Sequence, residues 1–298
     1  MEHTVSKYGL KEGAEEFPLM VVLGYIYKCN ANCPNCPYNY SNIRNDREVK
    51  EMPWGVFSRV VDEAAPYNAY LRMTGGGEPF LHSDITAQVE HAVKKGCGVG
   101  IITNGSKSAS GVLDVASAVE FSVDAGTKED YAKARPGLSW EILNKNVEEA
   151  VKNKGDTKII ASVINQKGID VDAAVNYWQN IVDVVQVRKF LTWGYNEDNS
   201  ADATPYLPPD KTVPCPWLFE RIYVDASGEI TYCNANINLD NSFANIKDRT
   251  IKEVWRGPEM EKLRELHVHG RGTEFPMCGK CPDWQYRSWT HNYWKLMK

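Results

Sequence analysis

The chain of 298 residues lacks the features that mark secreted, membrane-embedded and nucleic-acid-binding proteins. No run approaches the ~20 apolar residues that span a membrane, and the N-terminal stretch MEHTVSKYGLKEGAEEF holds no apolar core of a signal peptide. Lys and Arg are scattered rather than striped, and the formal net charge is −5, so neither nucleic acid nor an anionic membrane is an expected partner. These absences predict a globular, cytoplasmic protein.

Cysteine, by contrast, occurs eight times, and a reducing compartment favours metal ligation or catalysis over disulfides. Cys29, Cys33 and Cys36 form a C-x3-C-x2-C loop directly after an apolar run. Three thiolates at this spacing can hold three irons of a 4Fe-4S cluster and leave the fourth iron open. A closed zinc site would need a fourth ligand nearby, and residues 37–40 (PYNY) supply no ordinary one.

A second group of cysteines near the C-terminus is large enough for a fully protein-ligated centre. Two of them are spaced C-x2-C, which zinc sites also use, so zinc is an alternative to an iron-sulfur cluster for this group. Its members are Cys215, Cys233, Cys278 and Cys281.

Apolar β-rich runs alternate with helix-length amphipathic segments from residue 19 to about residue 190, and this alternation predicts βα units and a parallel sheet. Six such units predict an α/β fold with a partial (β/α)6 barrel, whose chemistry lies at the C-terminal ends of the strands. The predicted strands cover residues 19–27, 69–73, 98–103, 119–123, 158–164 and 184–190, and the predicted helices cover residues 53–65, 84–95, 111–117, 140–152 and 171–181.

We therefore divide the chain into four parts. Residues 1–18 are an N-terminal extension, residues 19–190 are the barrel, and residues 191–214 are a linker in which Gly, Asn, Asp and Pro break the periodicity. Residues 215–298 are a small α+β module. It is predicted to contain a hairpin over residues 218–224 and 229–233, with Gly228 in the turn, and helices over residues 250–268 that break at Gly257-Pro258.

The predicted second strand ends in TGGGEP, residues 74–79. Glycines let the backbone approach a ligand closely, and Glu78 can anchor an ammonium group. A glycine triplet alone is more often a tight turn, but beside the cysteine loop it favours a ligand site.

The cysteine loop, TGGGEP and their order on successive strand ends resemble the radical SAM superfamily across residues 19–190. The resemblance implies that the open iron binds the amino and carboxylate groups of S-adenosylmethionine (SAM), and that reductive cleavage of SAM yields a 5′-deoxyadenosyl radical. Many members carry an aromatic residue just before the third cysteine, where this chain has Asn35, and the nearby aromatic is Tyr38. The implied SAM contacts are Tyr38, Gly76, Gly77, Glu78, Asn104, Ser122, Asp124, Arg135 and Asn165.

Other roles stand beside these implied contacts. Ser122 and Asp124 could cap the next helix, and Asn104 begins an Asn-Gly pair that is common in turns. Arg135 could be a solvated surface charge.

The C-terminal module resembles the SPASM/twitch extension of this superfamily. Gly228 precedes Cys233 by five residues, as in that extension, but Arg287 stands where a full SPASM domain continues with cysteine. The shorter twitch form implies one auxiliary 4Fe-4S cluster on the four C-terminal cysteines, with no open iron and a role in electron transfer. The implied cofactors are two 4Fe-4S clusters and SAM, and the implied partner is an electron donor such as flavodoxin or ferredoxin.

Two absences bear on the substrate. Only 28 residues precede Cys29, fewer than the ~80 of the peptide-binding domain in many peptide-modifying relatives, and no cobalamin-binding domain is present. The layout resembles the aminoglycoside-pathway twitch enzymes, an aminocyclitol dehydrogenase and a neomycin epimerase. It implies an oxidoreductase that takes hydrogen from a carbinol of a sugar or aminocyclitol, while the auxiliary cluster accepts the second electron.

Arg188 is the predicted catalytic residue, since Gln186 and Arg188 share one face of a strand and would reach a substrate hydroxyl inside the barrel. A surface or salt-bridged role is the alternative. An epimerase would need a thiol donor, and Cys97 lies at the opposite end of the barrel, where a buried structural thiol is expected. A peptide maturase remains an alternative function, as does a non-catalytic iron-sulfur or zinc scaffold.

Overall fold

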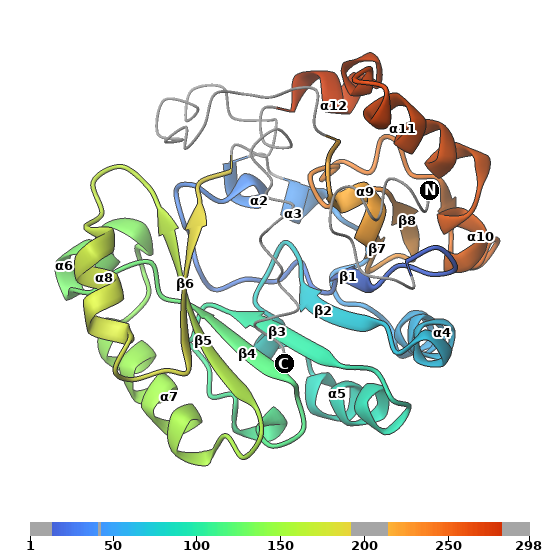
Figure 1. Ribbon diagram of the computed structural model, residues 1–298. Helices are drawn as coiled ribbons and strands as arrows, with labels where there is room; N and C mark the ends of the chain where they lie inside the picture. The colour runs from blue at the N-terminus through green and yellow to red at the C-terminus, as the bar shows by residue number, and fades with distance from the viewer. Residues whose placement is uncertain (1–13, 41–42, 192–213, 282–298) are drawn as a thin grey trace.

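The computed structural model describes residues 14–40, 43–191 and 214–281, and the six predicted parallel strands are all present in it (Figure 1). They lie side by side in chain order, each parallel to the next, in an open sheet. The partial barrel is therefore confirmed. The strands are β1 (Met20–Gly24), β2 (Tyr70–Thr74), β3 (Val99–Thr103), β4 (Ala118–Ser122), β5 (Lys158–Asn165) and β6 (Val184–Lys189).

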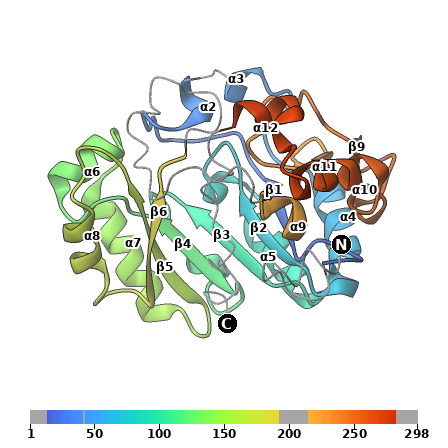
Figure 2. The ribbon, with the colours of Figure 1, turned by 45° about the horizontal axis from the view of Figure 1, so that its top comes forward.

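Amphipathic helices cover the outer face of this sheet (Figure 2). Four agree with prediction: α4 (Trp54–Ala64), α5 (Ile85–Lys94), α7 (Trp140–Asn153) and α8 (Val171–Trp178). Their buried positions fall on one face of each helix, which packs on the strands.

Two local predictions were wrong in the barrel. Residues 111–117 form no α-helix but only the 3-10 turn η3 (Ser110–Val112), because the chain reverses at Asp114, whose φ is +66°. The helix α6 (Lys128–Ala134) was not predicted, although Thr127 caps it by accepting a hydrogen bond from the Asp130 N–H.

The C-terminal hairpin continues the barrel sheet. Strand β7 (Arg221–Asp225) pairs in parallel with β1, and β8 (Glu229–Thr231) and β9 (Ala244–Asn245) extend the sheet to nine strands in antiparallel fashion. The hairpin turn holds Gly228 at a φ of +91°, as predicted. The predicted start of its first strand was wrong, because residues 217–220 form the short helix α9 (Trp217–Glu220).

The remaining elements frame these two parts. Helices α10 (Ile251–Trp255) and α11 (Pro258–Val268) are separated at Gly257, as predicted. The Trp255 indole N–H donates a hydrogen bond to the Ala14 carbonyl over 2.6 Å, which ties α10 to the N-terminal segment. None of the described helices is long and apolar enough to cross a membrane. Shorter elements are α2 (Pro37–Tyr40), α3 (Ile43–Asp46), α12 (Pro276–Lys280), η1 (Ala65–Tyr67), η2 (Pro79–Leu81) and η5 (Gly272–Glu274).

Three predicted segments fall wholly or mostly outside the described residues. They are the first part of the N-terminal extension, the linker at residues 192–213, and the tail from residue 282 onward, which includes Arg287.

Candidate active site

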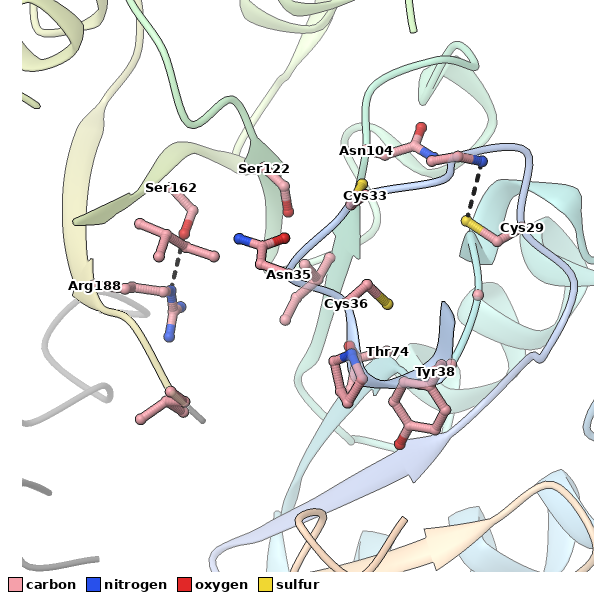
Figure 3. Close-up of a pocket in the computed structure, with 18 of the residues that line it drawn as sticks. Cys29, Cys33, Asn35, Cys36, Tyr38, Thr74, Asn104, Ser122, Ser162 and Arg188 are labelled. Atoms are coloured by element: carbon pink, nitrogen blue, oxygen red, sulfur yellow. Dashed lines mark hydrogen bonds between the residues drawn. The ribbon is translucent and has the colours of Figure 1, made fainter. Parts of the chain in front are cut away.

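A cavity of about 340 Å³ opens at the C-terminal ends of the barrel strands (Figure 3). Its wall combines the cysteine loop, the glycine loop after β2 and inward-facing side chains of β2 to β6. Because parallel strands bring their carboxyl ends to one edge, segments that lie far apart in the sequence meet here. Most of the predicted site residues thus border one cavity, and their roles stay predictions.

Cys29, Cys33 and Cys36 lie in the loop between β1 and α2 and line this cavity. Each sulfur has a hydrogen-bond donor: the Ala31 N–H at 3.4 Å from Cys29 Sγ, Arg135 Nη1 at 3.6 Å from Cys33 Sγ, and Arg44 Nη2 at 3.6 Å from Cys36 Sγ. Burial raises the pKa of Cys29 and of Cys36, and the Arg44 charge opposes that rise in both. The donors favour the thiolate forms, but burial outweighs the Arg44 charge at Cys29 and Cys36.

The described residues show neither a disulfide nor a converged site for a single metal ion. Nowhere among the described residues do three His, Cys, Asp or Glu side chains converge tightly enough to hold one metal ion. All eight cysteines are described, and none forms a disulfide. Zinc requires its ligands to converge on one point, whereas a 4Fe-4S cluster is larger and takes one thiolate per iron.

The glycine loop packs directly against the cysteine loop. A Cβ on Gly77 would lie 2.1 Å from the Lys28 carbonyl oxygen, and one on Gly76 would lie 2.5 Å from the Tyr27 ring. The Glu78 N–H also donates to the Lys28 carbonyl over 2.8 Å. Glycine is thus required here for the contact between two loops of the same chain, in addition to any ligand contact.

Glu78 is buried, and its carboxylate holds neighbouring loops together. It accepts hydrogen bonds from Thr103 Oγ1 at 2.7 Å and from the Asn104 N–H at 2.6 Å, and burial raises its pKa. The Asn104 side chain in turn donates to Asn30 Oδ1 in the cysteine loop over 3.1 Å. Both residues line the cavity, and their direct contacts with SAM stay predictions.

Asp124 and Arg135 form a buried ion pair beside Cys33. Arg135 Nε and Nη2 lie 2.8 and 2.6 Å from Asp124 Oδ2, and Asp124 Oδ1 accepts the Ile164 N–H over 2.9 Å. The surface-charge alternative for Arg135 is therefore wrong, since 14% of its side chain is exposed. The capping alternative is also wrong, because Thr127 caps α6 in place of Ser122 or Asp124.

Two predicted SAM contacts, Asn165 and Tyr38, differ from the others in their surroundings. Inward positions of β5 place Ser162 and Ile164 in the cavity wall, and the described wall does not include Asn165. Tyr38 borders the cavity, but its hydroxyl is hydrogen-bonded to Tyr223 of β7, so it ties the cysteine loop to the C-terminal module. A contact of Tyr38 with adenine stays a prediction.

Arg188 faces the barrel interior, as predicted, across the cavity from the cysteines (Figure 3). Its guanidinium donates to Ser162 Oγ over 2.9 Å, to Gln186 Oε1 over 2.8 Å and to both Glu120 carboxylate oxygens over 2.7 Å. Arg188 is therefore salt-bridged as well as cavity-lining.

The buried partners of Arg188 were missed at the sequence level. Arg72 Nη2 lies 3.4 Å from Glu120 Oε2, and the Glu120 side chain is 3% exposed. Burial alone would raise the pKa of Glu120, but the positive charges of Arg188 and Arg72 outweigh burial and lower it. One sequence signal could have indicated them. Each is a charged residue at an inward position of an otherwise apolar strand: Arg72 in YLRMT and Glu120 in AVEFS.

The C-terminal cysteines lie in the other module and do not line the described cavity. Cys215 precedes α9, Cys233 follows β8, and Cys278 and Cys281 lie at α12. His267, also missed, accepts the Cys215 N–H at Nδ1 over 3.3 Å, and burial lowers its pKa to about 4. That these four cysteines hold one cluster stays a prediction.

Cys97 lies two residues before β3 and does not line the cavity. It is 3% exposed, and burial raises its pKa to about 11. Its position agrees with the predicted structural thiol.

Sequence comparisons agree with this geometry. The model of the radical SAM superfamily matches residues 24–176, and that of an iron-sulfur cluster-binding domain, SPASM, matches residues 215–282. The chain therefore belongs to the radical SAM superfamily, and it carries a SPASM region. It is similar to a PqqA peptide cyclase of Xanthomonas euvesicatoria pv. vesicatoria (strain 85-10), with 24% identity over 90% of this chain and 82% of the relative.

Solved structures share the fold at lower identity. BtrN in complex with AdoMet and 2-DOIA aligns with a TM-score of 0.57 and 15% identity, covering 90% of this chain and 94% of BtrN. Streptococcus suis SuiB bound to precursor peptide SuiA aligns with a TM-score of 0.66 and 14% identity, covering 96% of this chain and 73% of SuiB. At this identity the likeness shows the fold alone.

Proposed function

We propose that this protein is a radical SAM enzyme that modifies a peptide. The observation that carries the proposal is a second hollow, of about 280 Å³, beside the SAM-binding cavity. The two share Asn35 and Phe190, and the second hollow is lined further by Gln166 and the lysines Lys133 and Lys167. Two adjoining hollows suit an extended chain better than a single sugar ring.

The relatives support the same substrate class. A relative covering most of this chain is named PqqA peptide cyclase, and SuiB has been seen bound to a precursor peptide. The peptide maturase considered as an alternative at the sequence level thus has more support than oxidation of a sugar.

The chain's residues divide the work. Cys29, Cys33 and Cys36 hold the first cluster, which together with SAM supplies hydrogen-atom abstraction from an unactivated carbon. Arg188, held by Glu120, presents its guanidinium to the cavity, where it orients a polar group of the substrate. The predicted SAM contacts line the same cavity, with Asn165 as the exception.

A dehydrogenase acting on a sugar or aminocyclitol is the second candidate. BtrN supports it, since the alignment covers 94% of that chain. The polar interior around Arg188 and Ser162 also suits hydroxyl groups. In both candidates the C-terminal cysteines hold an auxiliary 4Fe-4S cluster that accepts the second electron, and flavodoxin or ferredoxin supplies the first.

Deuterium transfer distinguishes the candidates. The anaerobic protein is reduced, supplied with SAM, and offered either deuterated peptides encoded near its gene or a deuterated aminocyclitol. We expect deuterium in 5′-deoxyadenosine with a peptide, together with a peptide product two mass units lighter after allowing for the label.

Two results would count against the peptide. Deuterium transfer from the aminocyclitol alone would favour the dehydrogenase, and formation of no 5′-deoxyadenosine with any substrate would remove the enzymatic proposal. Arg59→Gln, on the outer helix α4, is the matched control for the preparation.

A further inference from the structure

Arg44 connects the cysteine loop to the glycine loop, and no sequence motif marked it. It lies on α3, where its Nη2 lies 3.6 Å from Cys36 Sγ and its Nε donates to the Gly76 carbonyl over 2.6 Å. One planar guanidinium therefore contacts an iron-binding cysteine and the loop that the family uses for the methionine end of SAM. A guanidinium fork can span two acceptors in this way, whereas an ammonium is a compact point charge.

The charge of Arg44 is not compensated as that of Arg135 is. Arg135 donates to Cys33 but is paired with the Asp124 carboxylate. Among the described residues, no carboxylate is recorded within salt-bridge distance of Arg44, whose guanidinium contacts Cys36 Sγ and the Gly76 carbonyl. Within the described part of the chain, the positive charge of Arg44 therefore lies at the Cys36 sulfur without a carboxylate partner.

The backbone around Arg44 is also fixed. Lys50 Nζ donates to the Arg44 carbonyl over 2.7 Å and to the Asn45 carbonyl over 2.8 Å, which holds the end of α3 against the following chain. With the backbone fixed, only the side-chain rotamers of Arg44 remain to be ordered when its hydrogen bonds form. Arg44 is thus held ready at the junction of the two loops.

We propose that Arg44 is a positioning residue that raises the reduction potential of the cluster held by Cys29, Cys33 and Cys36 and holds the SAM loop in register with it. Hydrogen bonds to the sulfurs and a nearby positive charge favour the reduced, more negative state of an iron-sulfur centre. The contact with Gly76 fixes the distance between the cysteine loop and the SAM loop. This role rests on family membership and is independent of whether the substrate is a peptide.

Arg44→Gln and Arg44→Lys separate the two effects, with Arg59→Gln as control. The reduction potential is measured by an EPR-monitored titration of the SAM-responsive cluster, the SAM dissociation constant by anaerobic equilibrium dialysis, and cluster assembly by iron content. For Arg44→Gln we expect a more negative potential and about tenfold weaker SAM binding, from the loss of one charge-assisted hydrogen bond. For Arg44→Lys we expect a reduction potential near that of the unaltered protein, because the positive charge remains. We expect SAM binding to be as weak as in Arg44→Gln.

The proposal fails if Arg44→Gln retains iron and both quantities match those of Arg59→Gln. If Arg44→Gln cannot assemble its cluster, Arg44→Lys decides the matter: unchanged SAM affinity in that variant overturns the positioning role. None of these measurements includes a peptide, so they stand apart from the test of substrate class.

Discussion

The two groups of cysteines lie in different surroundings. Cys29, Cys33 and Cys36 border an open cavity and receive donors from the Ala31 backbone and from two arginines. The C-terminal four lie on or beside short elements of the module and border no part of that cavity. A centre that must admit SAM and a substrate needs open space beside it, whereas one that only passes electrons does not.

The charges buried near the two groups differ as well. Glu120 lies between Arg72 and Arg188 in the wall of the cavity. In the C-terminal module the buried Arg264 donates to the Leu218 carbonyl over 2.9 Å and the Trp255 carbonyl over 2.8 Å, and burial lowers its pKa to about 10. The cavity side thus keeps fixed ionic groups that can orient a substrate.

Replacing one cysteine in each group should give the largest difference between the two groups. Cys36→Ala should lower formation of 5′-deoxyadenosine at least hundredfold, because the open cluster loses a ligand, while Cys281→Ala should keep cleavage within about tenfold of the unaltered protein. On the proposal that each cysteine group holds one 4Fe-4S cluster, each variant should lose about four of about eight irons. The measurements are product formation by chromatography and iron content, and full cleavage in Cys36→Ala would contradict the assignment.

Glu120→Gln tests whether the cavity side depends on buried charge. Removing the carboxylate leaves two guanidinium groups without their shared partner, so the free energy of unfolding should fall by about 3–5 kcal/mol in anaerobic urea unfolding. Glu141→Gln, at the exposed pair with Lys128, should change stability little.

The Glu120 carboxylate should also make stability depend on pH, and Glu120→Gln should remove that dependence. The folded-state pKa of Glu120 is lowered from 4.5, so its stabilisation is fully present above pH 4.5 and is lost as the pH falls toward the folded-state value. Stability of the unaltered protein should therefore decrease over this range more steeply than that of Glu120→Gln. Parallel curves would show that the carboxylate is not held between the two cations.

Replacing one glycine near each cysteine group should give a smaller difference between the two groups. A Cβ at Gly77 would lie 2.1 Å from the Lys28 carbonyl oxygen, and one at Gly279 would lie 2.5 Å from the Thr273 carbonyl oxygen. Each alanine variant should lose about 1–3 kcal/mol of stability, because backbone must shift. Only Gly77→Ala should also weaken SAM binding in equilibrium dialysis; equal SAM affinities in the two variants would show that the Gly77 contact does not shape the SAM site.

The order of the strands and the location of the site were predictable because both follow from local patterns. The β-rich runs and the amphipathic helices between them repeat along the chain, and parallel strands deliver their C-terminal loops to one edge. The cysteine loop and TGGGEP are contiguous motifs at such strand ends, so the sequence located them before any contact was visible.

The sequence by itself thus determined the barrel, the family and the residues placed at the cavity mouth. The tertiary structure decided what those residues touch: Asp124 pairs with Arg135, Arg188 with Glu120, and Tyr38 with Tyr223. It also revealed Arg44 between the two loops and joined the C-terminal hairpin to β1. These partners depend on side chains that meet across many residues of intervening chain, and a local pattern records which residue occupies a position but not which distant group will lie against it.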